Sequence, residues 1–114
     1  ALERSLLEQV IALAYPAGMQ DPVTLGETGP TLLSMQPPKY PVALLRKAIQ
    51  GEVLMRVRVG RNGRTIEALV DRSSGYPEMD QAAIDSARSA RFQMPPSTPE
   101  LGLWAVIPVR FALR

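Results

Sequence analysis

Two stretches in the middle of the chain alternate apolar and polar residues, the pattern typical of strands that bury one face. The first is VLMRVRV, residues 53–59, and the second is TIEALVD, residues 65–71. Asn62-Gly63 lies between them and is a strong signal for a two-residue hairpin turn, in which both residues take positive φ. The pattern therefore predicts an antiparallel hairpin with one apolar and one polar face.

A turn at Asn62-Gly63 also fixes which residues of the two strands face each other. It predicts three apolar pairs on one face and an ion pair on the other: Val59 with Ile66, Val57 with Ala68, Met55 with Val70, and Arg58 with Glu67. The apolar residues and the opposite charges fall into register together, which supports the position of the turn. We expect Arg56 and Arg58 to lie on a solvated face, ion-paired with Glu67 and Asp71, in preference to forming an anion site.

Three further stretches have helical periodicity. Residues 2–14, LERSLLEQVIALA, form an amphipathic pattern that must be buried against this chain or a second copy of it. Residues 41–51, PVALLRKAIQG, begin with a proline suited to a first helical turn and end at Gly51, which suits a left-handed helix end. Residues 78–92 carry a stripe of small residues that would let a helix lie close to a sheet: Met79, Ala83, Ala87 and Ala90.

A last alternating stretch, residues 104–114, predicts a third strand. The order of elements from residue 41 is helix, strand, strand, helix, strand, and a right-handed crossover places the last strand beside the first. The predicted fold is α+β: a three-stranded antiparallel sheet in the order 2-1-3, covered on one face by two helices. Residues 1–36 form an N-terminal helical extension with a proline- and glycine-containing connector, and residues 37–114 form the domain.

Composition excludes several kinds of function. The 114 residues include no cysteine and no histidine, which removes the usual nucleophile pairs, the usual general base and the usual zinc ligands. A net charge of +2 without a basic run gives no support to nucleic-acid binding. We therefore expect no enzyme, no metal and no cofactor. The chain lacks an initial Met and a membrane-spanning stretch, so we expect a fragment or processed form whose targeting segment lies upstream.

Two polar motifs are interpreted as structural or solvent-exposed, without a catalytic role. Ser73-Ser74-Gly75 has no histidine to activate a serine and no following Lys-Ser/Thr of a phosphate loop, so we interpret it as a turn and helix cap. Asp80 and Asp85 lie on the exposed face of the predicted helix, where no apolar pocket would raise a carboxyl pKa.

The last strand is the first candidate binding site, because a strand at a sheet edge presents unpaired N–H and C=O groups to another strand. Pro108 has no N–H and should sit on the free side of that strand. Val106, Arg110 and Ala112 would then offer backbone groups to a guest, and Trp104 would pack at the start of the strand. From the residues alone, a proline that merely guards the edge against aggregation is the more common situation.

The second candidate is QPPKYP, residues 36–41. Its ordinary interpretation is a stiff, extended connector that leads into a helix. The functional alternative is that Gln36, Pro37, Pro38, Lys39 and Tyr40 lie beside a guest strand and contact it.

Five pieces of residues 37–114 resemble the C-terminal domain of the TonB family of bacterial energy transducers. They are PPKYP, QGEVLMRVRVGRNGR, SSGYPEMDQAAI, ARFQMPP and VIPVRF, which occur in that order and spacing. The first 36 residues are not part of the resemblance. The related TolA C-terminal domain has the same architecture but lacks this style of motif, so a TolA-like envelope-spanning domain is the alternative, together with a dimerising scaffold built on the 2–14 helix.

The resemblance implies a periplasmic domain, anchored to the inner membrane through an N-terminal segment absent from this chain. It implies capture of the Ton box peptide of TonB-dependent outer-membrane transporters by β-strand addition. Energy from the proton-motive force, gathered by motor proteins of the ExbB/ExbD type, would then drive siderophore or nutrient uptake. It favours peptide binding over a guard role for the last strand. The implied contacts are Gln36, Pro37, Pro38, Lys39, Tyr40, Trp104, Val106, Pro108, Arg110 and Ala112.

Overall fold

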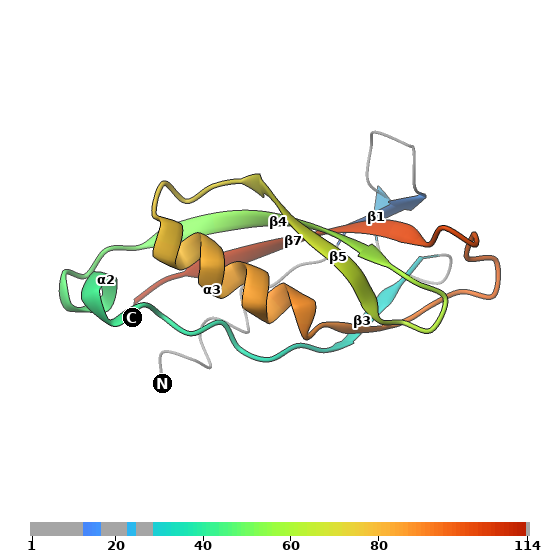
Figure 1. The fold of residues 1–114 in the computed structure, drawn as a ribbon, viewed down its shortest axis with the longest axis horizontal. Helices are drawn as coiled ribbons and strands as arrows, with labels where there is room; N and C mark the ends of the chain where they lie inside the picture. The colour runs from blue at the N-terminus through green and yellow to red at the C-terminus, as the bar shows by residue number, and fades with distance from the viewer. Residues whose placement is uncertain (1–12, 17–22, 25–28, 114) are drawn as a thin grey trace.

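The computed structural model describes residues 13–16, 23–24 and 29–113, and the elements are drawn in Figure 1. The described elements follow the order β1 (Leu13–Pro16), β2 (Val23–Thr24), β3 (Thr31–Ser34), α2 (Val42–Arg46), β4 (Gly51–Val59), β5 (Thr65–Arg72), α3 (Pro77–Arg88), β6 (Arg91–Gln93) and β7 (Leu103–Phe111). None of the described helices is long and apolar enough to cross a membrane.

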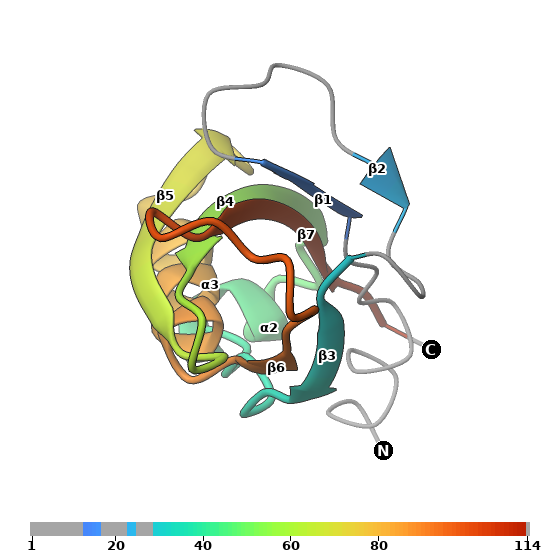
Figure 2. The same ribbon diagram turned by 90° about the vertical axis from the view of Figure 1, so that its right-hand side faces the viewer.

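The main sheet confirms the predicted core arrangement. β4 lies between β5 and β7 and pairs with both in antiparallel fashion, so the three strands expected from the sequence take the order 2-1-3. Both helices lie on the same side of this sheet, and the longer one, α3, runs along the strands (Figures 1 and 2). A separate two-stranded sheet joins β3 to β6.

The prediction of three strands was wrong in one respect. The described main sheet has five strands, because β1 pairs with the outer side of β7 and β2 pairs with β1. β7 is therefore not an edge over its whole length. The reason is that the exposed backbone groups of a sheet edge are satisfied by any segment that can lie alongside them in extended form.

The core lies between α3 and the face of the sheet formed by β4 and β7. Every second residue of both strands is fully buried, as the alternating pattern predicts: Val53, Met55, Val57 and Val59 with Ile107, Val109 and Phe111. The stripe of small residues on α3 meets them, since Met79, Ala83 and Ala87 are completely buried. A Cβ built on Gly51 would come 2.9 Å from the Met79 sulfur, so a larger residue there would force the end of the flexible Met79 side chain to shift.

The hairpin turn differs from the prediction. Among the turn residues, Gly63 takes positive φ, +80°, but Asn62 does not. The Gly63 N–H donates to the Gly60 carbonyl over 2.9 Å, and the Gly60 N–H donates to the Arg64 carbonyl over 3.0 Å. This is a type I turn followed by a left-handed glycine, which adds a residue to the loop and produces a bulge.

The bulge changes one predicted pair. Val59 lies opposite Thr65 in place of Ile66, and the Ile66 side chain is left 53% exposed. Beyond the bulge the predicted register is confirmed: Val57 faces Ala68, Met55 faces Val70, and Arg58 faces Glu67. The extra loop residue is absorbed next to the turn, so the buried face of the hairpin is unchanged.

The two described helices are shorter than predicted. α2 ends at Arg46, and Ala48, with φ +56°, supplies the left-handed residue expected of Gly51, which instead begins β4. α3 ends at Arg88, and residues 91–93 form β6 because they pair with β3. Helical periodicity continued past both ends, but sheet pairing of the flanking backbone set the boundaries.

Most of the helix predicted over residues 2–14 lies outside the described residues. Its last two positions, Leu13 and Ala14, contradict the prediction because they belong to β1. Tyr15 and Pro16 complete that strand. Pairing with β7 gives these four residues hydrogen-bonding partners outside their own segment, which overrides a local helical preference.

Candidate peptide-binding edge

The outer side of β7 is divided into a covered and an open part. β4 pairs with the other side of β7 along its whole length, from Leu103 to Phe111. On the outer side, β1 pairs with β7 only from Leu103 to Val106. Within the part of the chain that the structure describes, no strand pairs with the outer side of residues 107–111. We call residues 107–111 the open stretch, meaning only that no described strand pairs there; a sheet edge of this kind is a surface to which another strand can add.

Pro108 indicates which backbone groups of β7 face that edge. It lies opposite Leu54 in an uninterrupted pairing with β4. Because proline cannot donate to a ladder, its nitrogen belongs on the side away from β4. Backbone groups alternate along an antiparallel strand, so Trp104, Val106, Pro108 and Arg110 direct theirs to the outer side. Trp104 and Val106 lie opposite β1, whereas Pro108 and Arg110 lie on the open stretch.

A hollow of about 350 Å³ flanks the C-terminal end of this open stretch. It is lined by Gln50, Gly51, Glu52, Arg110, Phe111 and Ala112. Arg110 forms an ion pair with Glu52 at 3.2 Å, and both side chains are about half exposed. Of these residues, the sequence singled out Arg110 and Ala112. Gln50 and Glu52 were missed, and the register of the last strand against the first was the signal that would have found Glu52.

Ala112 lies just beyond the end of β7. The next residue is tied to the segment before β4, because the Leu113 N–H donates to Gln50 Oε1 over 3.0 Å. The chain leaves the sheet at this point, so Ala112 lies at the rim of the hollow and not within a strand.

The first residue of the segment QPPKYP, Gln36, is hydrogen-bonded to the C-terminal end of α3. The Gln36 N–H donates to Ser89 Oγ over 2.9 Å, and the Ser86 hydroxyl donates to the Gln36 carbonyl. An extended connector over residues 36–39 is expected to be exposed, and Gln36, Pro37 and Lys39 are, but Pro38 is fully buried, so the expectation was wrong for Pro38. The segment closes the core beside α3, and burial of an apolar ring there is favourable.

Tyr40 connects this segment to β7. Its ring meets the Phe111 ring edge-on, with centroids 5.6 Å apart and an interplanar angle of 84°. Its hydroxyl donates to the Ile49 carbonyl, and burial raises the pKa of the Tyr40 phenol above its ordinary value. Of the QPPKYP residues, Tyr40 thus contacts the candidate edge strand, whereas Gln36 is bonded to the end of α3.

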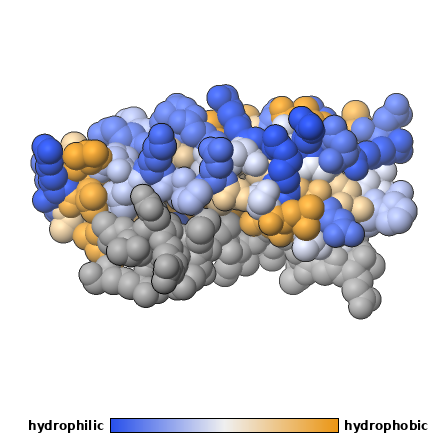
Figure 3. Space-filling view, turned by 90° about the horizontal axis from the view of Figure 1, so that it is seen from below, coloured by the Kyte–Doolittle hydropathy of each residue, from blue (hydrophilic) through white to orange (hydrophobic). Residues whose placement is uncertain are grey.

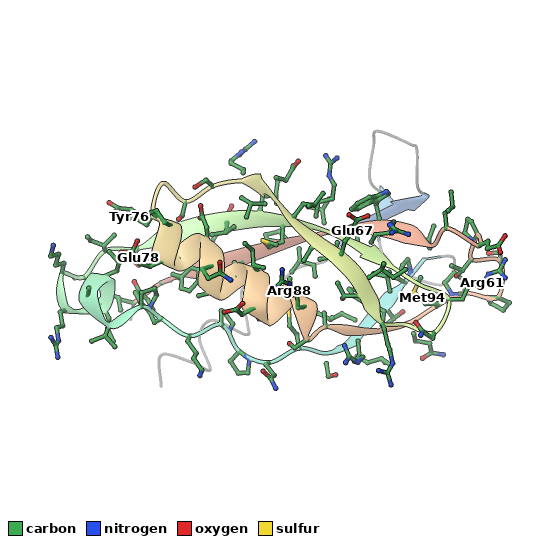
Figure 4. All side chains as sticks on the ribbon, viewed as in Figure 1. Arg61, Glu67, Tyr76, Glu78, Arg88 and Met94 are labelled. Carbon is green, nitrogen blue, oxygen red and sulfur yellow. The ribbon has the colours of Figure 1, made fainter. Side chains whose placement is uncertain are left out.

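The charged face of the sheet is paired as predicted. Arg58 Nε lies 2.7 Å from Glu67 Oε1, and Arg56 Nη2 lies 3.0 Å from Asp71 Oδ1. Figure 4 shows Glu67 on the side of the sheet away from α3. Trp104 lies opposite Arg58 on this same face and is half-buried. Exposed pairs of this kind contribute little to stability, so we interpret this face as solvated surface.

Ser73 and Ser74 form the predicted turn but not the predicted helix cap, because the N-cap residue of α3 is Tyr76 and no side chain caps it. Both hydroxyls donate to the Asp80 carboxylate, as does the Ser74 N–H over 2.9 Å. Burial alone would raise the pKa of Asp80, but these hydrogen bonds outweigh it and lower the pKa below its ordinary value. The motif therefore fixes the entry to α3. Among the described residues, no group of acidic side chains could hold a metal ion.

The fold defines a class of small α+β domain in which two helices cover one face of an antiparallel sheet. The family described as Gram-negative bacterial TonB protein C-terminal matches residues 36–113, and the chain belongs to that family. The match agrees with the TonB resemblance in preference to the TolA-like alternative.

Two curated relatives and one solved structure are similar to this chain. Protein TonB of Xanthomonas campestris pv. campestris (strain B100) is 40% identical over 81 residues, which cover 70% of this chain and 36% of the relative. Protein tonB2 of Pseudomonas aeruginosa is 35% identical over 80 residues, covering 67% of this chain and 28% of the relative. The chain thus spans about a third of the length of these relatives. The solution structure of the Pseudomonas aeruginosa TonB C-terminal domain shares the fold, with a TM-score of 0.62 at 21% identity, covering 79% of this chain and 92% of the other.

Proposed function

We propose that this domain captures a short extended peptide, the Ton box of a TonB-dependent outer-membrane transporter, by adding it as a strand to β7. The observation that carries the proposal is that, among the described residues, no strand pairs with the outer side of residues 107–111, which lies beside a hollow lined by Arg110. Backbone pairing would supply the affinity, and the hollow would receive a side chain of the guest. Membership of the TonB family supports this choice of partner.

The wider role follows from that membership. The domain would stand in the periplasm, anchored to the inner membrane by a segment outside this chain. Motor proteins of the ExbB/ExbD type would supply proton-motive energy, and the bound peptide would pass it to the transporter for uptake of siderophores or other nutrients. No catalytic chemistry is required, which agrees with a chain that has no histidine and no cysteine.

The test is a backbone substitution with a matched control. Arg110→Pro removes an N–H from the open side of β7 while leaving the residue's pairing with β4 possible. Arg110→Ala removes the same side chain and keeps the N–H. With a synthetic Ton box peptide, we expect Arg110→Pro to weaken binding about tenfold, the value of roughly one hydrogen bond. Calorimetry would measure it, and NMR should show shifts along 104–113 and 36–41.

The result against the proposal is equally specific. Arg110→Ala should bind within about threefold of the parent, since its backbone donor is intact. If the proline and alanine variants bind the peptide equally well, the guest does not pair with this edge. Shifts confined to the charged face around Arg56 and Arg58 would also contradict strand addition at β7.

A further inference from the structure

The short strand β1 lies on the edge through which β7 would accept a partner. It pairs in antiparallel fashion with Leu103–Val106, directly next to the open stretch (Figures 1 and 2). We propose that β1 is an intramolecular cover that competes with the partner strand for this edge, so that the N-terminal part of the chain sets the affinity of the domain for its partner. The inference rests on the proposed function, because it takes the edge of β7 as the site of capture.

The pairing of β1 is small compared with the pairing on the other side of β7. β1 is 4 residues long, and its own outer neighbour β2 is 2 residues long. β7 has 9 residues, all paired with β4. Two-stranded ribbons of this size are marginal in water without further packing. β1 can therefore leave the edge while the sheet formed by β7, β4 and β5 stays intact.

Prolines flank the described pairing of β1 with β7. Pro16 is the last residue of β1 and lies opposite Leu103. Pro108 lies two residues beyond Val106, the last residue of β7 in the described pairing. Because Pro108 has no N–H, the outer side of β7 offers one donor fewer to any strand that pairs beyond Val106. Pairing of β1 with this edge is weakened there, which makes β1 easier to displace.

A partner strand and β1 cannot both use the whole edge. Strands in proteins are typically about 5–6 residues long, so a partner that extends past the open stretch toward Val106 meets β1. If β1 covers the edge for about nine-tenths of the time, the apparent affinity for such a partner is reduced about tenfold. Any change upstream that withdraws β1 would restore the full affinity.

The absence of cysteine from the chain allows a clean test. Ala14 lies directly opposite Ala105, and the alternation set by Pro108 makes this a pair that exchanges no hydrogen bonds. Cα atoms in such pairs are about 4.5 Å apart, within the span of a disulfide. The double variant Ala14→Cys/Ala105→Cys would fix β1 in place when oxidised and release it when reduced. The single variant Ala14→Cys controls for the redox treatment.

The first readout is binding of the synthetic Ton box peptide. We expect the oxidised double variant to bind about tenfold more weakly than the reduced form, and the single variant to be insensitive to reductant. Equal affinity of the two redox forms would overturn the cover while leaving peptide capture intact. Covalent dimers on oxidation, in place of a cross-linked monomer, would overturn its intramolecular character.

The second readout does not depend on the peptide. In the reduced form, amide hydrogen exchange should be faster at Trp104 and Val106, which face β1, than at Ile107 and Val109, which face β4. Oxidation should slow exchange at Trp104 and Val106 about tenfold or more. Unchanged rates would contradict a mobile cover. Failure of the peptide to bind either form would count against the proposed function alone, since exchange decides the inference by itself.

Discussion

Tyr40 is the residue at which the connector, the loop before β4 and the end of β7 meet. Its ring packs on Phe111 and its hydroxyl donates to the Ile49 carbonyl. Neighbouring Lys39 is exposed. Adjacent positions of one motif therefore have different roles: Tyr40 supports the fold beside the candidate edge, and Lys39 is available to a partner.

Substitutions at these two positions should separate folding from binding. Tyr40→Phe should lower the free energy of unfolding by about 1–2 kcal/mol, because the Ile49 carbonyl loses its donor. Tyr40→Ala should lower it by about 3 kcal/mol or more through the loss of packing on Phe111. Lys39→Ala should leave stability within about 0.5 kcal/mol of the parent and weaken peptide binding. Urea denaturation measures the first effects and calorimetry the last. Normal peptide binding by Lys39→Ala would show that Lys39 contributes nothing to capture.

Asp80 predicts a dependence of stability on acid. The hydrogen bonds from Ser73 and Ser74 hold its pKa in the folded state below its ordinary value, so the folded domain favours the ionised form. The stabilisation is fully present above the unfolded-state pKa and is lost as pH falls through the folded-state pKa. Urea unfolding between pH 6 and about 2 should therefore show a steeper loss for the parent than for Asp80→Asn. Parallel pH profiles for the two proteins would contradict this role of the carboxylate.

At the scale of elements, the hairpin turn and the turn before α3 offer a matched pair of glycines. Gly63 and Gly75 both have positive φ, +80° and +91°. A Cβ on Gly63 would come 2.0 Å from the Phe92 carbonyl oxygen, whereas a Cβ on Gly75 would meet nothing within 4 Å. An L-residue with a side chain would thus be strained in its backbone at both positions, but only at Gly63 would its Cβ also collide with a neighbour.

Substituting alanine at each position should measure that difference. Gly75→Ala should lower the free energy of unfolding by about 1 kcal/mol, from backbone strain alone. Gly63→Ala should cost several times more, about 3 kcal/mol or above, because the turn must move away from Phe92. Thermal or urea unfolding of both variants decides it. Equal losses would mean that the contact between the turn and β6 is not maintained in solution.

The sequence correctly predicted the elements in which the hydrophobic positions along the chain are also the positions that are buried in the structure. Alternation in β4 and β7 and the alanine stripe of α3 were reliable because each records one buried face of a regular element. The failures were at positions where a distant partner decides the outcome. Leu13 and Ala14 form a strand because they pair with β7, and residues 91–93 form a strand because they pair with β3. Pro38 is fully buried in the segment whose Gln36 is hydrogen-bonded to the end of α3. The sequence around each of these residues carries no information about the distant segments that lie beside them in the fold.

The candidate site was predictable in the same uneven way. Pro108 and Arg110 could be placed on the outer side of the last strand from the geometry of proline alone. The division of that side at Val106 could not, because it depends on the pairing with β1. The binding roles of these residues stay predictions until the peptide experiments are done.

At the scale of the whole molecule, we expect a monomer. Among the described residues, the part of β7 that no strand pairs is short, and pairing of two copies would bring together two such edges, each with Pro108 and a charged Arg110, whereas a guest peptide meets only one. Seen from below, the described surface is largely polar, with apolar side chains at the end formed by α2 and in a second patch in the other half of the molecule (Figure 3). Val42, 61% exposed, belongs to that helix.

Sedimentation of the full chain tests this expectation against the dimerising alternative. The chain should sediment as a monomer from micromolar to millimolar concentration, and a version beginning at Pro37 should do so as well if the preceding residues pack only on their own chain. Concentration-dependent dimers of the full chain alone would support a role of the N-terminal region in assembly and contradict the monomer.

The direction of β7 has a mechanical consequence. β4 and β7 run along the long axis of the molecule (Figure 1). A peptide paired with β7 and pulled along that axis would load all of its backbone hydrogen bonds at once, in shear. A pull across the axis would break the same hydrogen bonds one after another, starting from one end. The same hydrogen bonds would thus withstand a larger force along β7 than across it. A transducer that uses this edge would keep its peptide while the force acts along the strand and would release it when the direction of the force turns away from the strand.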